Sequence, residues 1–147
     1  MFFPKLFPDF THFLDASLMR SLGKTKTMRI EDYMSSPVMI TQRNVSIQHL
    51  KDMLTRKGLS AVPVLEEDGT ITGIVTSNDL VRANNEDAVV QDIMSDRVHI
   101  VMKNNRVKDA AGMMVKNNVH HLVVMDEGKV VGMISSMDIM KVFSETA

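Results

Sequence analysis

The chain contains no cysteine, very little net charge and no long hydrophobic run. The lack of cysteine excludes disulfides and thiolate metal sites, and it fits a reducing compartment. A formal net charge of -1 gives no reason to expect nucleic acid or an anionic membrane as a partner. No apolar run reaches the roughly 18 residues of a membrane span. The N-terminus, MFFPKLFPDF, lacks the basic and apolar regions of a cleaved signal peptide, so we expect a cytoplasmic protein.

Sequence signatures of catalysis are also missing. No Ser-His-Asp or Cys-His arrangement stands out with a supporting motif, and there is no lysine-containing phosphate loop. His120 and His121 invite a metal interpretation, but neighbouring strand residues point to opposite faces and cannot easily chelate one ion. We therefore expect no metal site, no catalytic cofactor and no enzymatic activity.

The sequence does contain an internal duplication. Residues 30–65 align with 90–125, and after one deletion in a turn residues 67–82 align with 126–141. Two long copies with one gap indicate a duplicated module rather than a solenoid of many repeats. A single copy, such as residues 30–82, buries too little surface to be stable alone, so we expect both copies to share one core.

Both copies predict the element order β-α-β-β-α. A short strand is expected at 38–40 and again at 98–100, before a helix with apolar residues at helical spacing. Two buried segments joined by a glycine-containing turn then predict an antiparallel strand pair, and a short helix closes each copy. The expected strand pairs are 61–65 with 71–75 and 121–125 with 130–134. Packing the two sheets face to face produces a pseudo-two-fold axis and two related clefts between the copies.

The ends of the longer helices can also be predicted. Ser46 and Asn105 carry side chains that suit the N-cap position of the two helices. Gly58 and Asn118 align with each other and tolerate the left-handed conformation that often ends a helix. We therefore expect one helix to run from Ser46 to Gly58 and the other from Asn105 to Asn118.

Each copy ends in a related seven-residue motif, GIVTSND in the first and GMISSMD in the second. The motifs place Thr76 and Asp79, or Ser135 and Asp138, at a strand-to-helix junction. One interpretation is structural, because a hydroxyl residue and an acid three positions later cap a helix. The other is a nucleotide site, in which the helix N-terminus receives phosphate and the carboxylate accepts hydrogen bonds from the ribose hydroxyls.

The element order, the LSAVPV segment and both motifs together resemble the CBS domain, named after cystathionine β-synthase; a tandem pair forms a Bateman module. The resemblance implies an α+β fold of two repeats, 30–85 and 86–147, packed through their sheets with pseudo-two-fold symmetry. It also implies an adenosine ligand in the clefts: AMP, ADP, ATP or sometimes S-adenosylmethionine. We expect a disk-shaped homodimer that senses this ligand and acts on a regulated protein that the sequence does not identify.

The resemblance assigns site residues by position. In the family the aspartate holds the ribose, the hydroxyl residue lies near the phosphates, and the opposite copy holds the adenine. One expected site consists of Ser135, Met137, Asp138, Met39, Ile40, Leu59, Ser60, Ala61 and Pro63. The other consists of Thr76, Asn78, Asp79, His99, Ile100, Val119, His120 and His121. Arg82 and Lys141 lie one helical turn beyond the aspartates and are either phosphate contacts or solvated surface charges.

Residues 1–29 lie outside the duplication and form a hydrophobic, aromatic extension. The extension contains Phe2, Phe3, Phe7, Phe10 and Phe13. We expect a helix here, packed on the module, across a dimer interface or against another protein or membrane surface. Two further functions stay open: a structural interaction module whose motifs are only helix caps, and a metal- or redox-linked stress protein that uses the histidines at 120 and 121.

Overall fold

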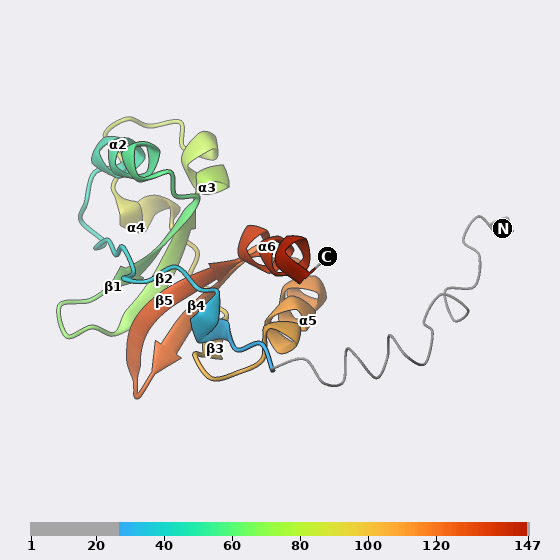
Figure 1. Cartoon of the computed structure of the whole chain (residues 1–147). Helices are drawn as coiled ribbons and strands as arrows, with labels where there is room; N and C mark the ends of the chain where they lie inside the picture. The colour runs from blue at the N-terminus through green and yellow to red at the C-terminus, as the bar shows by residue number, and fades with distance from the viewer. Residues whose placement is uncertain (1–26, 147) are drawn as a thin grey trace, which may run out of the picture.

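The computed structural model describes residues 27–146, and its elements follow the duplication. The first copy contains η2 (Ile30–Asp32), α2 (Ile47–Lys57), β1 (Ala61–Leu65), β2 (Ile71–Thr76) and α3 (Ser77–Arg82). The second contains α4 (Val90–Ile93), β3 (Ile100–Met102), α5 (Val107–Asn117), β4 (His121–Asp126), β5 (Lys129–Ser135) and α6 (Ser136–Thr146). The two sheets lie between α2 and α3 on one side and α5 and α6 on the other (Figure 1). The helix expected before residue 27 falls outside the described residues.

The strand pairs match the sequence prediction, whereas the first strand of each copy does not. β1 pairs antiparallel with β2, β4 pairs antiparallel with β5, and β3 adds to β4 in parallel. No strand forms at 38–40. The next residue, Thr41, makes an isolated bridge to Val64, and the strand expected at 98–100 begins at Ile100. Val38 and Val98 instead pack into the core between the sheets, so the first residue of each triplet marks a core contact made before the chain joins a sheet.

The caps of α2 confirm the sequence prediction, as does the end of α5. Ser46 Oγ accepts a hydrogen bond from the His49 backbone N–H (3.1 Å). Gly58 ends α2 with φ 64° and Asn118 ends α5 with φ 52°, both in the left-handed region. The helices therefore end where the residue type makes this conformation accessible.

The expected N-cap of α5 is wrong. Arg106 occupies the N-cap position and makes no side-chain cap hydrogen bond. Asn105 lies one residue earlier, and its Oδ1 accepts the Met102 backbone N–H (2.9 Å). The asparagine therefore closes the turn after β3 and does not cap the helix. Asparagine side chains readily form such local hydrogen bonds to the backbone.

Replacing Ser46 by alanine is expected to lower the free energy of unfolding by about 1 kcal/mol, because the hydrogen bond that caps α2 is lost. Denaturant unfolding of the full chain measures this change. Arg106→Ala is the matched control at the equivalent position of α5, where the side chain makes no cap bond, so a loss of a few tenths of a kcal/mol is expected. Equal losses in the two variants would contradict the assignment.

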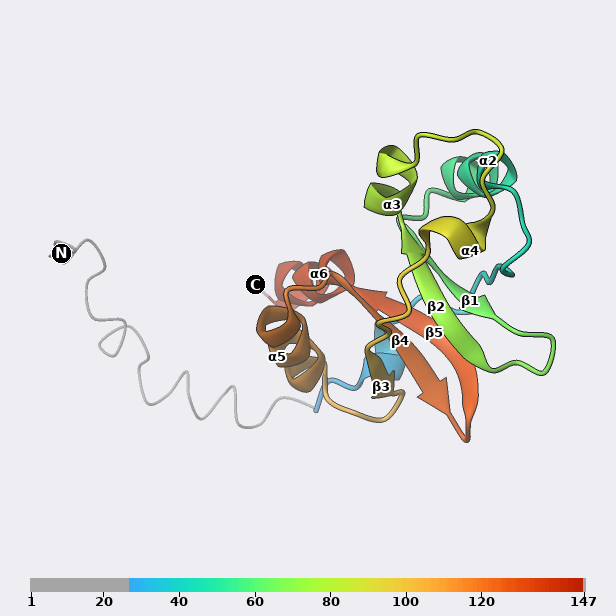
Figure 2. The same cartoon turned by 180° about the vertical axis from the view of Figure 1, so that it is seen from behind.

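The start of each copy packs against the other copy. Ile30 of η2 is completely buried in the core of the second copy, beside Val124 and Ile134. Val90 of α4 is likewise buried in the core of the first copy, beside Leu50. Figures 1 and 2 show η2 next to β3 and β4, and α4 beneath α2 and α3. The exchange interlocks the two halves, so neither core is complete without the other copy.

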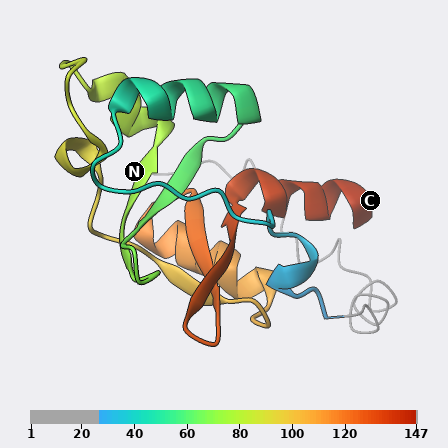
Figure 3. The ribbon, with the colours of Figure 1, turned by 90° about the vertical axis from the view of Figure 1, so that its left-hand side faces the viewer.

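A third core cluster joins the sheets. Ala61 and Ile74 of the first copy pack against Val123 and Met133 of the second. Figure 3 shows the strands of the two halves crossing between α2 and the helices α5 and α6. Face-to-face packing of two small sheets confirms the expected architecture and brings the motif of each copy next to the opposite copy.

Candidate functional site

The two motifs cap the helices that follow them. In the second copy the Ser135 N–H donates to Asp138 Oδ2 (2.8 Å), and the Asp138 N–H donates to Ser135 Oγ (3.1 Å). In the first copy the Thr76 N–H donates to Asp79 Oδ2 (2.8 Å), and the Thr76 hydroxyl donates to the same oxygen (3.0 Å). The second motif is therefore a reciprocal capping box, and the first is a variant in which the carboxylate accepts both bonds.

Each cap uses only one oxygen of its aspartate. Oδ1 of Asp79 and of Asp138 accepts no hydrogen bond from any residue between 27 and 146. Both aspartates also line cavities. An unused carboxylate oxygen facing a cavity can accept hydrogen bonds from a diol, so capping and ligand binding are compatible.

Two cavities of nearly equal size lie between the copies, one at each motif. Cleft A measures about 400 Å³ and cleft B about 410 Å³, within the range of small-molecule sites. Cleft A is lined by Ser60, Ile74, Thr76, Ser77, Asn78, Asp79, Ser95, Arg97, His99, Asn118, Val119, His120 and His121. Cleft B is lined by Ser35, Pro37, Val38, Met39, Gly58, Leu59, Ser60, Ala61, His121, Met133, Ser135, Met137, Asp138 and Lys141.

Most of the residues expected from the sequence line the predicted cleft, but four do not. Ile40 and Ile100 are 44% and 39% exposed and line neither cleft. Each follows a residue that does face a cleft, and successive residues of an extended chain point to opposite sides. Pro63 is buried within β1, and Arg82 is exposed on α3. Of the two candidate phosphate contacts, only Lys141 lies at a cleft.

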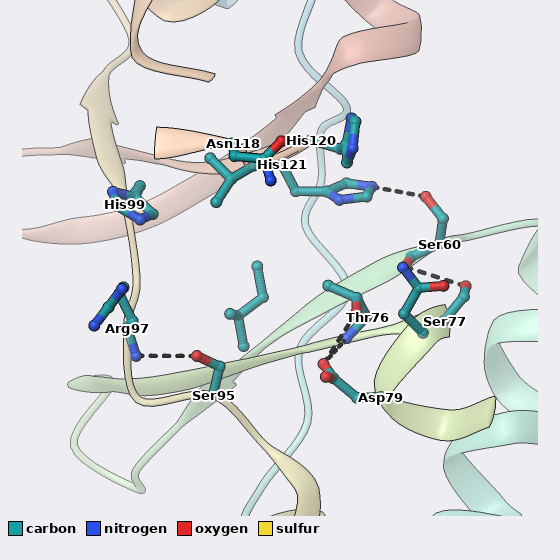
Figure 4. A pocket seen from close by; sticks show the side chains of 13 residues that line it. Ser60, Thr76, Ser77, Asp79, Ser95, Arg97, His99, Asn118, His120 and His121 are labelled. Atoms are coloured by element: carbon teal, nitrogen blue, oxygen red, sulfur yellow. Dashed lines mark hydrogen bonds between the residues drawn. The ribbon is translucent and has the colours of Figure 1, made fainter. Parts of the chain in front are cut away.

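Ten residues that line the clefts were not predicted, and four of them lie in the segments just before Val38 and Val98. Ser35 and Pro37 line cleft B, and the aligned Ser95 and Arg97 line cleft A. The two serines are identical in the aligned copies, which was the only available signal. The Arg97 guanidinium forms no ion pair within residues 27–146. Figure 4 shows Arg97 on the side of cleft A opposite Asp79.

The two clefts differ in charge and polarity more than in size. Cleft A carries Arg97 and three histidines against the single acid Asp79. Cleft B carries Lys141 and one histidine against Asp138, and its walls include Met39, Met133 and Met137. Cleft A is thus the more basic cleft, and cleft B has the softer, more polarizable wall.

His121 has a perturbed environment. Burial lowers its pKa below the ordinary 6.5, the neighbouring His120 lowers it further, and Asp138 acts in the opposite direction. The imidazole is therefore held neutral near physiological pH, because charging it in a partly buried position costs free energy.

Two other classes of site find no support in residues 27–146. This part of the chain holds no group of three His, Asp or Glu side chains that could bind a metal ion. None of its helices combines the length and apolar character needed to cross a bilayer.

Curated relatives of the chain include several archaeal proteins. MJ1426, an uncharacterised protein of Methanocaldococcus jannaschii, is 26% identical over 78% of this chain and 90% of its own length. MJ1225 of the same organism is 27% identical over 76% of this chain but only 41% of itself. The L-aspartate semialdehyde sulfurtransferase of that organism is 28% identical over 82% of this chain and 24% of the enzyme. The chain therefore spans less than half the length of some of these relatives.

Solved structures share the fold. The CBS domain pair of protein MJ0100, in complex with 5′-methylthioadenosine and S-adenosyl-L-methionine, superposes with a TM-score of 0.78 at 27% identity. The match covers 83% of this chain and 100% of that one. CBSX2 in complex with AMP superposes with a TM-score of 0.71 at 20% identity, over 81% of this chain and 98% of that one.

The family match covers both copies. The sequence model of the CBS domain family matches residues 30–86 and again residues 90–145. CBS domain pairs are in general regulatory and non-catalytic, and the enzymes among the relatives are much longer than the matched part. Two matches in tandem, on a fold that superposes with solved CBS domain pairs, make this chain a member of the CBS domain family.

Proposed function

We propose that the protein is a regulatory module that binds an adenosine nucleotide of the AMP, ADP or ATP class in clefts A and B. The observation that carries the proposal is the pair of aspartates, Asp79 and Asp138. Each keeps one carboxylate oxygen free of the cap, and each lines a cavity of ligand size between the copies. The ribose hydroxyls are the donors that these oxygens suit. The MJ0100 domain pair, solved in complex with two adenosine compounds, supports the adenosine part of this ligand.

In cleft B, Asp138 accepts hydrogen bonds from the ribose. Ser135, just before α6, and Lys141, within α6, line the same cleft and are available for contact with phosphate. Met39 and Ala61 of the opposite copy supply apolar surface for the base. A thioether beside an aromatic ring contributes about 0.3–1.5 kcal/mol. A pocket wall of this kind holds a flat base without requiring a charged partner.

In cleft A, Asp79 has the same role and Thr76 is the hydroxyl residue. Val119 is the equivalent of Leu59 as an apolar wall residue, whereas His99 and Arg97 stand where cleft B has Met39 and Pro37. Cleft A therefore has an aspartate for the ribose, as cleft B does, and adds the Arg97 guanidinium and imidazole rings around the remaining ligand atoms.

A ligand in either cleft contacts both copies, because each cleft combines the motif of one copy with residues of the other. It therefore favours whichever relative placement of the copies binds it more tightly, and only this difference in affinity can transmit a signal. In our proposal, a homodimer presents this change to a regulated protein.

Thermal unfolding with candidate ligands tests the proposal. AMP, ADP, ATP, S-adenosylmethionine and 5′-methylthioadenosine are each added to the full chain. A ligand present at 100 times its Kd is expected to raise the free energy of unfolding by about 2.7 kcal/mol. The absence of a shift with every adenosine compound would contradict the proposal and favour a purely structural module. A shift with Zn²⁺ that is lost in His120→Ala would favour the metal alternative instead.

A further inference from the structure

Two side chains line both clefts and form the partition between them. Ser60 and His121 each contribute to cleft A and to cleft B. Ser60 Oγ and His121 Nε2 lie 2.8 Å apart, in a hydrogen bond between the two copies. Figure 4 shows the imidazole extending from the second copy toward Ser60 of the first. Any ligand large enough to fill either cleft therefore lies against the same pair.

The backbone on either side of this partition is attached to both motif helices. The Ser60 carbonyl accepts hydrogen bonds from the Ser77 N–H (2.9 Å) and the Ser77 hydroxyl (3.2 Å), at the first residue of α3. The His120 carbonyl accepts the Ser136 N–H (2.9 Å), at the first residue of α6. These bonds restrain the main chain of the partition. A change of protonation at His121 is therefore a simpler response to a ligand than a displacement of the strand.

Several titratable or charged side chains line the two clefts together with His121. Asp138 and Lys141 of α6 share cleft B with the imidazole, and Asp79 of α3 shares cleft A. Arg97 and His99, from the segment before β3, and His120 also line cleft A. Burial lowers the pKa of the His121 imidazole, and only the Asp138 carboxylate raises it. The ring is therefore neutral until more negative charge arrives.

We propose that His121 couples the two clefts: a phosphate-bearing ligand in one cleft draws a proton onto this shared imidazole, and the charged imidazole strengthens binding of a second such ligand in the other. The inference rests on the proposed function, since it requires nucleotides in both clefts. The proton comes from solvent and adds to the unprotonated ring nitrogen. The ring then donates from both nitrogens, one of them to Ser60.

The coupling is positive because only the first ligand has to charge the His121 ring. The first phosphate group must charge a ring that its surroundings keep neutral, so part of its binding free energy is consumed. The second ligand meets a ring that is already charged and does not bear this cost. Removal of such a cost by a first ligand is positive cooperativity, and it is reciprocal between the two clefts.

Titration of the full chain with AMP tests the coupling. Methyl-labelled methionine NMR reports on cleft B, where Met39, Met133 and Met137 lie, while calorimetry in buffers of different ionisation enthalpy counts protons. Near pH 7.5 we expect proton uptake with the first AMP and an affinity at cleft B about 5-fold higher when cleft A is filled. As the pH is lowered until the ring becomes charged without a ligand, the coupling and the proton uptake should both disappear. Adenosine, which has no phosphate, should show neither effect.

Two variants separate the possible outcomes. His121→Gln keeps a hydrogen-bonding group for Ser60 but cannot be protonated, so the coupling and its proton uptake should be lost even if the affinity of each cleft for AMP changes as well. His49→Gln, on the exposed face of α2 and outside both clefts, should retain both. Coupling that survives in His121→Gln, or two clefts that bind AMP independently in the wild type, would overturn this inference alone. A wild-type chain that binds no adenosine compound would overturn the proposed function and the coupling with it.

Discussion

Replacing Asp138 by alanine is expected to weaken nucleotide binding at cleft B by about 10- to 100-fold. Asp138 lines the cavity and its Oδ1 is not used by the cap, and a hydrogen bond to a charged acceptor contributes about 1.5–3 kcal/mol. Calorimetric titration with AMP, resolved by the methionine methyl signals of cleft B, measures the loss. Binding at cleft A should change much less, because its ribose partner is Asp79.

The control for this prediction must remove an equivalent cap without touching a cleft. Asp92 provides it, because its Oδ2 accepts the Val89 N–H (2.9 Å) at the start of α4 and it lines neither cleft. Both alanine variants should lower the free energy of unfolding by about 1 kcal/mol. Only Asp138→Ala should lose affinity. A similar loss of affinity in both variants would mean that Asp138 acts through helix stability alone.

Gly132→Ala is expected to lower the free energy of unfolding by about 2 kcal/mol, as overpacking of a tight contact does. A Cβ added at Gly132 would lie 2.7 Å from the Ser35 carbonyl oxygen and 2.8 Å from Met34 Sδ. The methionine can move, but the carbonyl cannot move freely. Ser35 exchanges two backbone hydrogen bonds with Met133 (2.8 and 3.2 Å), and these attach the start of the first copy to β5. Denaturant unfolding measures the loss.

The same substitution elsewhere should have the opposite sign. Gly112 lies in the middle of α5, and an added Cβ would meet nothing within 4 Å. Gly112→Ala should therefore stabilise the protein by roughly 0.5–1 kcal/mol, because glycine costs conformational entropy in a helix. Gly73→Ala should behave like Gly132→Ala, with its Cβ 2.9 Å from the Ser95 carbonyl oxygen. A neutral Gly132→Ala would show that the exchanged segment is only loosely attached.

These contacts give a physical reason why the first residue of each motif is glycine. The motif begins with glycine because the exchanged start of the opposite copy crosses the strand there with no room for a side chain. The later residues of the motif cap the next helix and line a cleft. One short motif therefore combines a backbone crossing, a helix start and a candidate ligand contact.

The sequence by itself determined the features that depend on neighbouring residues. Helical spacing, the cap at Ser46 and the helix ends at Gly58 and Asn118 are local properties, and the structure confirms them. The duplication predicted the element order, since two related copies must fold alike. The motifs and the family resemblance located most of the residues that line the two clefts.

Only the tertiary structure decided which distant segments meet. The exchange of η2 and α4 between the copies, the entry of Arg97 into cleft A and the contact between Ser60 and His121 join residues far apart in the chain. Apolar character marks a residue for burial without naming its partner, as Val38 and Val98 show by packing between the sheets instead of forming strands. Partners across the core are chosen by how the two sheets stack, and no local pattern of residues carries that information.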